Sequence, residues 1–126
     1  MAYIKKAGEF VAEAEAALAA GRSNAALLCA IHAAISSADA VTVALSEVRS
    51  TDPNHLVLAD LLRSAGRGSD EFETHARQLV SLLQLKNLIE YEARTARLAE
   101  AEDAVKRARR LVDWALKTAT ESGIGQ

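Results

Sequence analysis

The sequence is poor in the residues that break helices or crosslink chains. Among 126 residues there are one proline, one cysteine and 4% aromatic residues. So little proline beside abundant alanine and leucine favours helices over sheets. The single Cys29 excludes an internal disulfide and lies in an apolar run, as a buried thiol does. Nothing indicates an oxidising compartment, so we expect a cytoplasmic protein.

Patterns typical of metal and cofactor sites are also missing. Di-iron helical bundles need a Glu three positions before a His, and His32, His55 and His75 all lack one. A single cysteine cannot build a zinc site of several thiolates. The glycines beside Arg67 are not followed by the Gly-Lys-Ser/Thr pattern of a phosphate-binding loop. We therefore predict no metal and no cofactor.

Charge and hydropathy exclude two further classes. The formal net charge is −2, so there is no global basic field, and any nucleic-acid contact must come from a local patch. The longest uncharged run, between Arg22 and Asp39, is too short to span a bilayer, and we expect no membrane partner. The acidic residues that follow Lys5 and Lys6 are unlike the apolar core of a signal peptide.

The spacing of apolar residues predicts one domain over residues 1–126, an all-α up-and-down bundle of four to five helices. Ser23 or Asn24 is the expected cap of the second helix, and Asp52 with Pro53 the expected start of the third. A bend is expected between Tyr91 and Leu98, with Thr95 as a possible cap. The predicted helices cover residues 3–20, 23–48, 53–65, 70–91 and 98–118, and residues 121–126 are expected to fray.

The last predicted helix carries an apolar seam and a dense basic run. We expect Trp114 beside the seam to pack at a bundle end or a dimer face. Opposite charges lie three or four positions from the basic run, so a solvated helix face is favoured over a phosphate-contacting patch. The seam is Leu98, Ala101, Val105, Ala108, Val112, Ala115 and Ala119, and the run is Lys106, Arg107, Arg109 and Arg110.

The stretch Leu82–Tyr91 is apolar on most of its circumference, which predicts a central helix with neighbours on several sides. It nevertheless ends in polar residues. Lys86 and Glu90 are four apart and face the same way, as do Asn87 and Tyr91. A cation, an amide, a carboxylate and a phenol on one apolar rod make the best candidate site in the chain.

The pattern Lys86-Asn87-x-x-x-Tyr91 on a leucine-rich helix, preceded by the alanine-rich stretch 30–40, resembles the HEPN domain family. The resemblance implies a small helical bundle that pairs as a homodimer. Many members are toxin ribonucleases or partners of nucleotidyltransferases in toxin–antitoxin pairs. A nucleotidyltransferase or antitoxin partner, and RNA or a nucleotide as ligand, are therefore expected here.

The ribonuclease members carry Arg, four to six residues, then His, late in the bundle. This chain has Lys86, four residues, then Tyr91, so both signature positions differ. Arg49 and His55 have the required spacing, but a capped proline turn is predicted between them, and we attribute the match to chance. The leading hypothesis is a non-catalytic bundle that binds a nucleotide, RNA or partner protein.

The expected ligand-binding residues are Lys86, Asn87, Glu90, Tyr91, Asp39 and Arg94. Asp39 belongs to a strip with His32 and Ser36 on successive turns of the second helix. One interpretation is that these residues are ordinary polar groups, either exposed to solvent or hydrogen-bonded within the bundle. The other is that they form the wall of a cleft facing Lys86 and Glu90.

Two alternatives remain open. A metal-independent ribonuclease would use Lys86 to stabilise the phosphorane, although Lys lacks the bidentate fork of Arg. Tyr91 replaces His poorly because an ordinary phenol keeps its proton at neutral pH, so His32 or His55 would have to supply the imidazole. The third hypothesis is a helical adaptor that acts through an outer surface.

Overall fold

A computed structural model describes residues 2–47, 52, 54–91 and 94–121. The described residues form five α-helices and no strand, which confirms the all-α bundle. Their bounds lie within a few residues of the predicted ones. The helices are α1 Ala2–Ala19, α2 Ser23–Ser46, α3 Leu56–Ala65, α4 Asp70–Tyr91 and α5 Leu98–Glu121.

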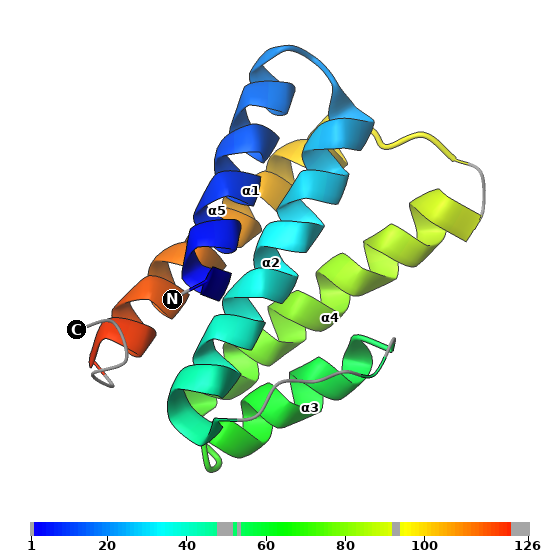
Figure 1. Cartoon of the computed structure of the whole chain (residues 1–126). Helices are drawn as coiled ribbons and strands as arrows, with labels where there is room; N and C mark the ends of the chain where they lie inside the picture. The colour runs from blue at the N-terminus through cyan, green and yellow to red at the C-terminus, as the bar shows by residue number, and fades with distance from the viewer. Residues whose placement is uncertain (1, 48–51, 53, 92–93, 122–126) are drawn as a thin grey trace.

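The centre of the bundle is α2. It packs against all four other helices, with α1 and α5 on one side and α3 and α4 on the other (Figure 1). Its buried positions are mostly small, among them Ala26, Ala30, Ala33 and Ala34, and small side chains let neighbouring helices approach closely. The prediction that Leu82–Tyr91 is the central helix was therefore wrong. In α4 the buried residues stop at Leu83, and the last two turns lie at the edge of the bundle.

The length and hydropathy of α2 would be enough for a membrane span, but 72% of its most apolar window is buried inside the bundle. Ser37 and Thr42, fully buried on this helix, direct their hydroxyls to the carbonyl oxygens of Ala33 and Asp39. These features are those of a core helix whose polar groups are satisfied within the fold.

The start of α2 differs from the prediction. Arg22 is the N-cap residue and its side chain makes no capping hydrogen bond, so neither Ser23 nor Asn24 caps the helix. The Oδ1 atom of Asn24 instead accepts a hydrogen bond from the backbone N–H of Ala96 at 2.7 Å. This bond ties the α1–α2 turn to the segment that precedes α5.

The start of α3 also differs. The helix begins at Leu56, and the side chain of Asn54 accepts from the Leu56 N–H at 3.1 Å. Asp52 accepts from the Asn54 N–H at 2.8 Å and so stabilises the turn before the helix, not the helix itself. Arg49 and Pro53, and most of the predicted frayed tail, lie outside the described residues.

The predicted break between Tyr91 and Leu98 is confirmed, but its cap is not Thr95. Glu100 accepts from the backbone N–H of Arg97 at 3.0 Å, one half of a capping box. It also accepts two hydrogen bonds from the guanidinium of Arg94, both at 2.8 Å. The bonds from Arg94, with that from Arg97, lower the pKa of Glu100 to about 2.

We expect Glu100→Gln to lower the free energy of unfolding by about 1–2 kcal/mol at pH 7, after allowance for solvent screening. Because the folded pKa lies below the ordinary value of 4.5, this stability is present above pH 4.5 and is lost as the pH falls towards 2. Urea denaturation of both proteins between pH 2 and pH 7 measures the difference. Glu9→Gln, at an exposed position of α1, is the control. A difference that does not change with pH would contradict the ion pair.

The seam of α5 is buried as predicted, except that Leu98 is 53% exposed. Trp114 packs inside the bundle, against α4. Its ring stacks on His75 with 4.1 Å between centroids and meets Phe72 edge to face at 5.0 Å. Its indole N–H donates to Glu71 at 2.6 Å. Trp114 therefore joins α5 to the first turns of α4.

Candidate functional site

The candidate site lies near the C-terminal end of α4, where the helix face that packs on the core extends beyond the other helices. Leu79 and Leu83 are buried, and the next positions along the same stripe are Lys86 and Glu90. The ammonium of Lys86 donates to a carboxylate oxygen of Glu90 at 3.3 Å. The pair predicted from their spacing is thus formed, at the edge of the fold.

A cavity of about 140 Å³ opens beside Lys86, between the last turns of α4 and the first turn of α3. His55, immediately before α3, forms the wall opposite α4. The cavity therefore brings together an imidazole, an ammonium, two amides and a phenol. Its lining residues are Asn54, His55, Leu56, Leu83, Lys86, Asn87 and Tyr91.

The surroundings of His55 favour the neutral imidazole. Burial lowers its pKa below the ordinary value of 6.5, and the positive charges of Lys86 and His32 lower it further. At neutral pH one ring nitrogen is then free to accept a proton or a hydrogen bond. Lys86 supplies the cation and His55 the acceptor.

The size of the cavity limits what it can hold. Sites for whole drug-sized ligands usually measure about 300–1,000 Å³. A volume of about 140 Å³ instead fits one group of a larger ligand, such as a phosphate or part of a sugar. The rest of the ligand would lie along the surface, where the side chain of Tyr91 is 79% exposed.

A family model for the HEPN domain matches residues 1–119. The chain belongs to the HEPN family. The match extends over four helices and nearly all of α5, and includes every residue that lines the cavity. Membership supports a function related to nucleotides or RNA. No curated protein and no solved structure matched the chain significantly.

Three of the six expected ligand-binding residues line the cavity of this HEPN bundle: Lys86, Asn87 and Tyr91. Glu90 contacts Lys86 but is not part of the lining. Asp39, partly buried on α2, and Arg94, bonded to Glu100, also lie outside the lining.

Of the two histidines considered for the site, His55 and His32, only His55 lines the cavity. His55 lines the cavity, as one sequence hypothesis required, whereas His32 is exposed and stacks on Phe10 of α1 at 5.3 Å. Ser36 is buried whereas His32 is exposed, and none of His32, Ser36 and Asp39 belongs to the lining of the cavity.

Sequence analysis missed Asn54 as a site residue, although its place in the Asp-Pro-Asn turn before a helix was a usable signal. For metals, the described part of the chain has no group of three or more His, Cys, Asp or Glu side chains able to hold an ion.

Proposed function

We propose that this HEPN protein binds a phosphate-bearing ligand, either RNA or a nucleotide, in the cavity between α3 and α4. The observation that carries the proposal is the convergence of Lys86 and His55 on one small polar cavity. The ammonium of Lys86 would pair with the phosphate, and the amides of Asn54 and Asn87 would donate to its oxygens or to a ribose hydroxyl.

Replacing Lys86 by alanine is expected to weaken the binding of a fluorescent single-stranded RNA about ten-fold or more, because one charge-assisted contact is worth about 1.5–3 kcal/mol. The slope of log Kd against log salt should fall by about 0.7, the loss of one phosphate contact on a single strand. Fluorescence anisotropy at several salt concentrations measures both, and competition with a mononucleotide distinguishes the two ligand classes.

Two variants test whether the effect comes from this cavity. Lys117→Ala removes the same charge from an exposed position of α5 and should change the Kd little. Glu90→Gln weakens the competing ion pair of Lys86 and should tighten binding. Equal losses in Lys86→Ala and Lys117→Ala, or unchanged binding in Lys86→Ala, would refute the assignment.

Metal-independent RNA cleavage is the second candidate, and the position of His55 favours it. Neutral His55 would take the proton of a ribose 2′-OH, whose oxygen attacks the adjacent phosphorus. Lys86 would stabilise the phosphorane charge. The bond to the 5′ oxygen would then break, that oxygen would take a proton from the phenol of Tyr91, and a 2′,3′-cyclic phosphate would remain.

Partners are proposals at the level of the family. HEPN domains commonly dimerise and act with RNA or with protein partners. We propose that this chain also forms a homodimer, in the cytoplasm, and that a nucleotidyltransferase or antitoxin is its partner protein. Co-purification with the products of neighbouring genes tests the partner.

A further inference from the structure

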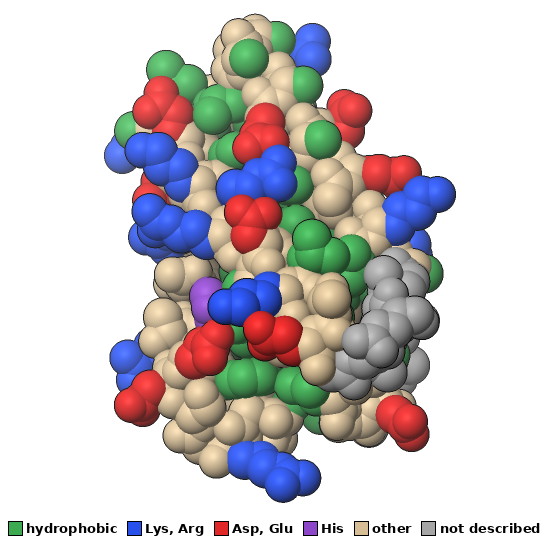
Figure 2. All heavy atoms as spheres, turned by 90° about the vertical axis from the view of Figure 1, so that its left-hand side faces the viewer, with side chains coloured by type: hydrophobic (Ala, Val, Ile, Leu, Met, Phe, Trp, Pro, Cys, Tyr) green, Lys and Arg blue, Asp and Glu red, His purple; other side chains and the backbone are tan. Residues whose placement is uncertain are grey.

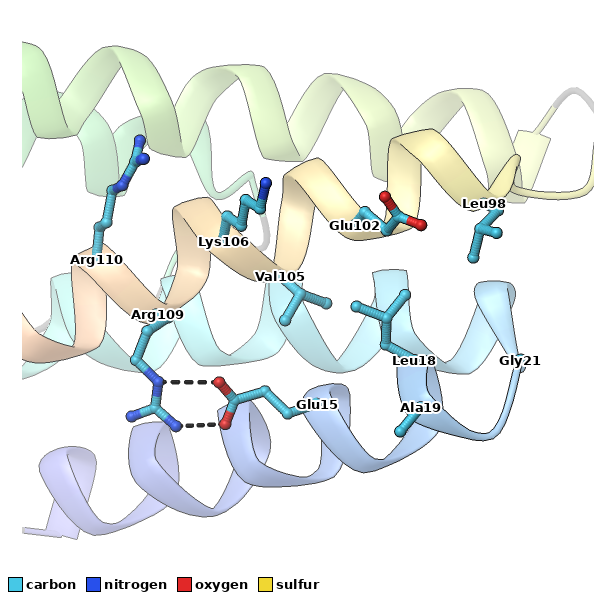
Figure 3. A pocket seen from close by; sticks show the side chains of 10 residues that line it. All are labelled: Glu15, Leu18, Ala19, Gly21, Leu98, Glu102, Val105, Lys106, Arg109 and Arg110. Carbon is cyan, nitrogen blue, oxygen red and sulfur yellow. Dashed lines mark hydrogen bonds and ion pairs between the residues drawn. The ribbon is translucent and has the colours of Figure 1, made fainter.

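A large hollow lies away from the cavity, between the end of α1 and the first half of α5 (Figure 3). It measures about 680 Å³, within the range of about 300–1,000 Å³ that is usual for small-molecule sites. Small residues at the end of α1 leave this space open, because Ala19 is exposed and Gly21 follows it in the turn. We call the hollow the α1–α5 groove.

The groove is apolar at one end and charged at the other. Leu18 of α1 and Leu98 of α5 line the end nearest the α1–α2 turn, and Leu98 is 53% exposed. The other end is lined by the cations Lys106, Arg109 and Arg110 of α5. Figure 3 shows the two groups separated along the groove, and Figure 2 shows hydrophobic side chains exposed between charged ones on this side of the molecule. A matching ligand therefore has an apolar part and a charged part.

An ion pair closes the charged end of the groove. The guanidinium of Arg109 donates from Nε to a carboxylate oxygen of Glu15 at 3.2 Å, and from Nη2 to the other oxygen. The hydrogen bond from Arg109 lowers the pKa of Glu15, so the carboxylate stays ionised at neutral pH. A helix from another protein lying along the groove would have to cross this bridge, whereas a flexible chain that ends before it would not. The bridge thus favours a small ligand.

The charges at the rim favour a ligand with an anionic group. Glu15 and Arg109 neutralise each other, which leaves Lys106 and Arg110 opposed by Glu102 alone. These three side chains are exposed, and no ion pair of theirs is found among the described residues. Lys106 and Arg110 are four positions apart, so both can reach one carboxylate. Glu102 lies one turn nearer the apolar end.

We propose that the α1–α5 groove binds a single-chain anionic amphiphile of the class of medium-chain fatty carboxylates. The alkyl chain lies on Leu18, Ala19 and Leu98, and the carboxylate lies between Lys106 and Arg110. Leu98 and Lys106 are eight residues apart, about 12 Å along α5, and an extended chain of ten carbons spans about 11 Å. The length of the apolar part of the groove therefore suits a ten-carbon chain.

This site is separate from the His55–Lys86 cavity. The groove is formed by α1 and α5 and the cavity by α3 and α4, and α2 lies between the two pairs of helices (Figure 1). Lys86→Ala should therefore leave carboxylate binding unchanged, and Ala19→Trp should leave RNA binding unchanged. The two proposals can fail separately.

NMR titration of the ¹⁵N-labelled full chain with sodium decanoate and with decyltrimethylammonium bromide tests the ligand class, because the two probes share a chain and differ in the charge of the head. We expect decanoate to shift the amide signals of Ala19, Gly21 and Leu98 and to bind at least ten-fold more tightly than the cation. Dodecanoate should bind about four- to sixteen-fold more tightly than decanoate, since it adds two methylenes. Equal binding of the two heads, or no shift of these signals at millimolar decanoate, overturns the proposal.

Two variants test the geometry, and circular dichroism checks that each one folds. Ala19→Trp fills the apolar end and should weaken decanoate binding at least ten-fold. Ala2→Trp, at an exposed position at the other end of α1, is the matched control and should leave the Kd unchanged. Lys106→Glu combined with Arg110→Glu should reverse the preference, so that the ammonium probe binds more tightly than decanoate. Wild-type affinity in Ala19→Trp, or an unreversed preference in the charge variant, would show that the proposal is wrong.

Sedimentation with vesicles of phosphatidylglycerol and phosphatidylcholine separates a free amphiphile from a lipid held in a bilayer. We expect the wild type to remain in the supernatant. Cosedimentation that Ala19→Trp abolishes would assign the groove to a membrane lipid and overturn the proposal of a free carboxylate.

Discussion

Trp114→Ala is expected to lower the free energy of unfolding by about 3–5 kcal/mol, as removal of a buried Trp usually does. The indole fills the space between α4 and α5, stacks on His75 and donates to Glu71. For a domain of this size the loss corresponds to a fall of roughly 10–20 °C in Tm. Urea denaturation followed by circular dichroism is the measurement, because the chain has only this one tryptophan.

Trp114→Phe separates packing from hydrogen bonding. It keeps an aromatic ring but removes the N–H that donates to Glu71, and a loss of about 1–1.5 kcal/mol is expected. Burial holds the pKa of His75 below 6.5, so its pKa should rise in Trp114→Ala, which NMR titration detects. A loss below 1 kcal/mol in Trp114→Ala would show that another contact holds α4 and α5 together.

His55→Ala is expected to slow RNA cleavage by about 10²–10⁴-fold in the ribonuclease alternative, the usual effect of losing a general base. Because its pKa lies below 6.5, the base is already deprotonated at neutral pH. The rate should therefore rise with pH below 6.5 and level off before pH 7. The assay is cleavage of total bacterial RNA by the purified protein without added metal, with Lys86→Ala and Tyr91→Phe beside it.

His32→Ala is the matched control, because this imidazole lies outside the cavity and stacks on Phe10. Only a small change in rate is expected. Intact RNA with folded wild-type protein would reject the ribonuclease alternative and leave the cavity as a binding site. Equal losses in the two histidine variants would instead point to a site that His55 does not define.

Local rules predicted most of the helices and one side of the site. The four-residue spacing placed Lys86 against Glu90, and the glycines marked the turns before α2 and α4 closely. These local rules failed where the role of a residue depends on a contact with a residue elsewhere in the chain. The oxygen of Asn24 bonds Ala96, 72 positions away, and no pattern near Asn24 indicates this. Arg94 is likewise bonded to Glu100 and not turned towards the cavity.

The choice of central helix failed for a different reason. The leucines around α4 suggested contacts on every side, yet Leu85, Leu88 and Ile89 are only partly covered. The alanines of α2 carry little hydrophobic area each and gave a weaker signal, although their small size lets four helices pack around one. Hydrophobicity alone does not measure how closely helices can approach.

The position of α2 between the first and the last helix also affects how the chain folds during synthesis. The α1–α2 hairpin can form early from local contacts, but the face of α2 that packs on α5 stays uncovered until Leu98–Glu121 has left the ribosome. Until then the nascent chain presents a long apolar surface of the kind that chaperones bind. The low charge of α2, which suits it to the core, thus leaves an apolar surface on the nascent chain until α5 is available to cover it.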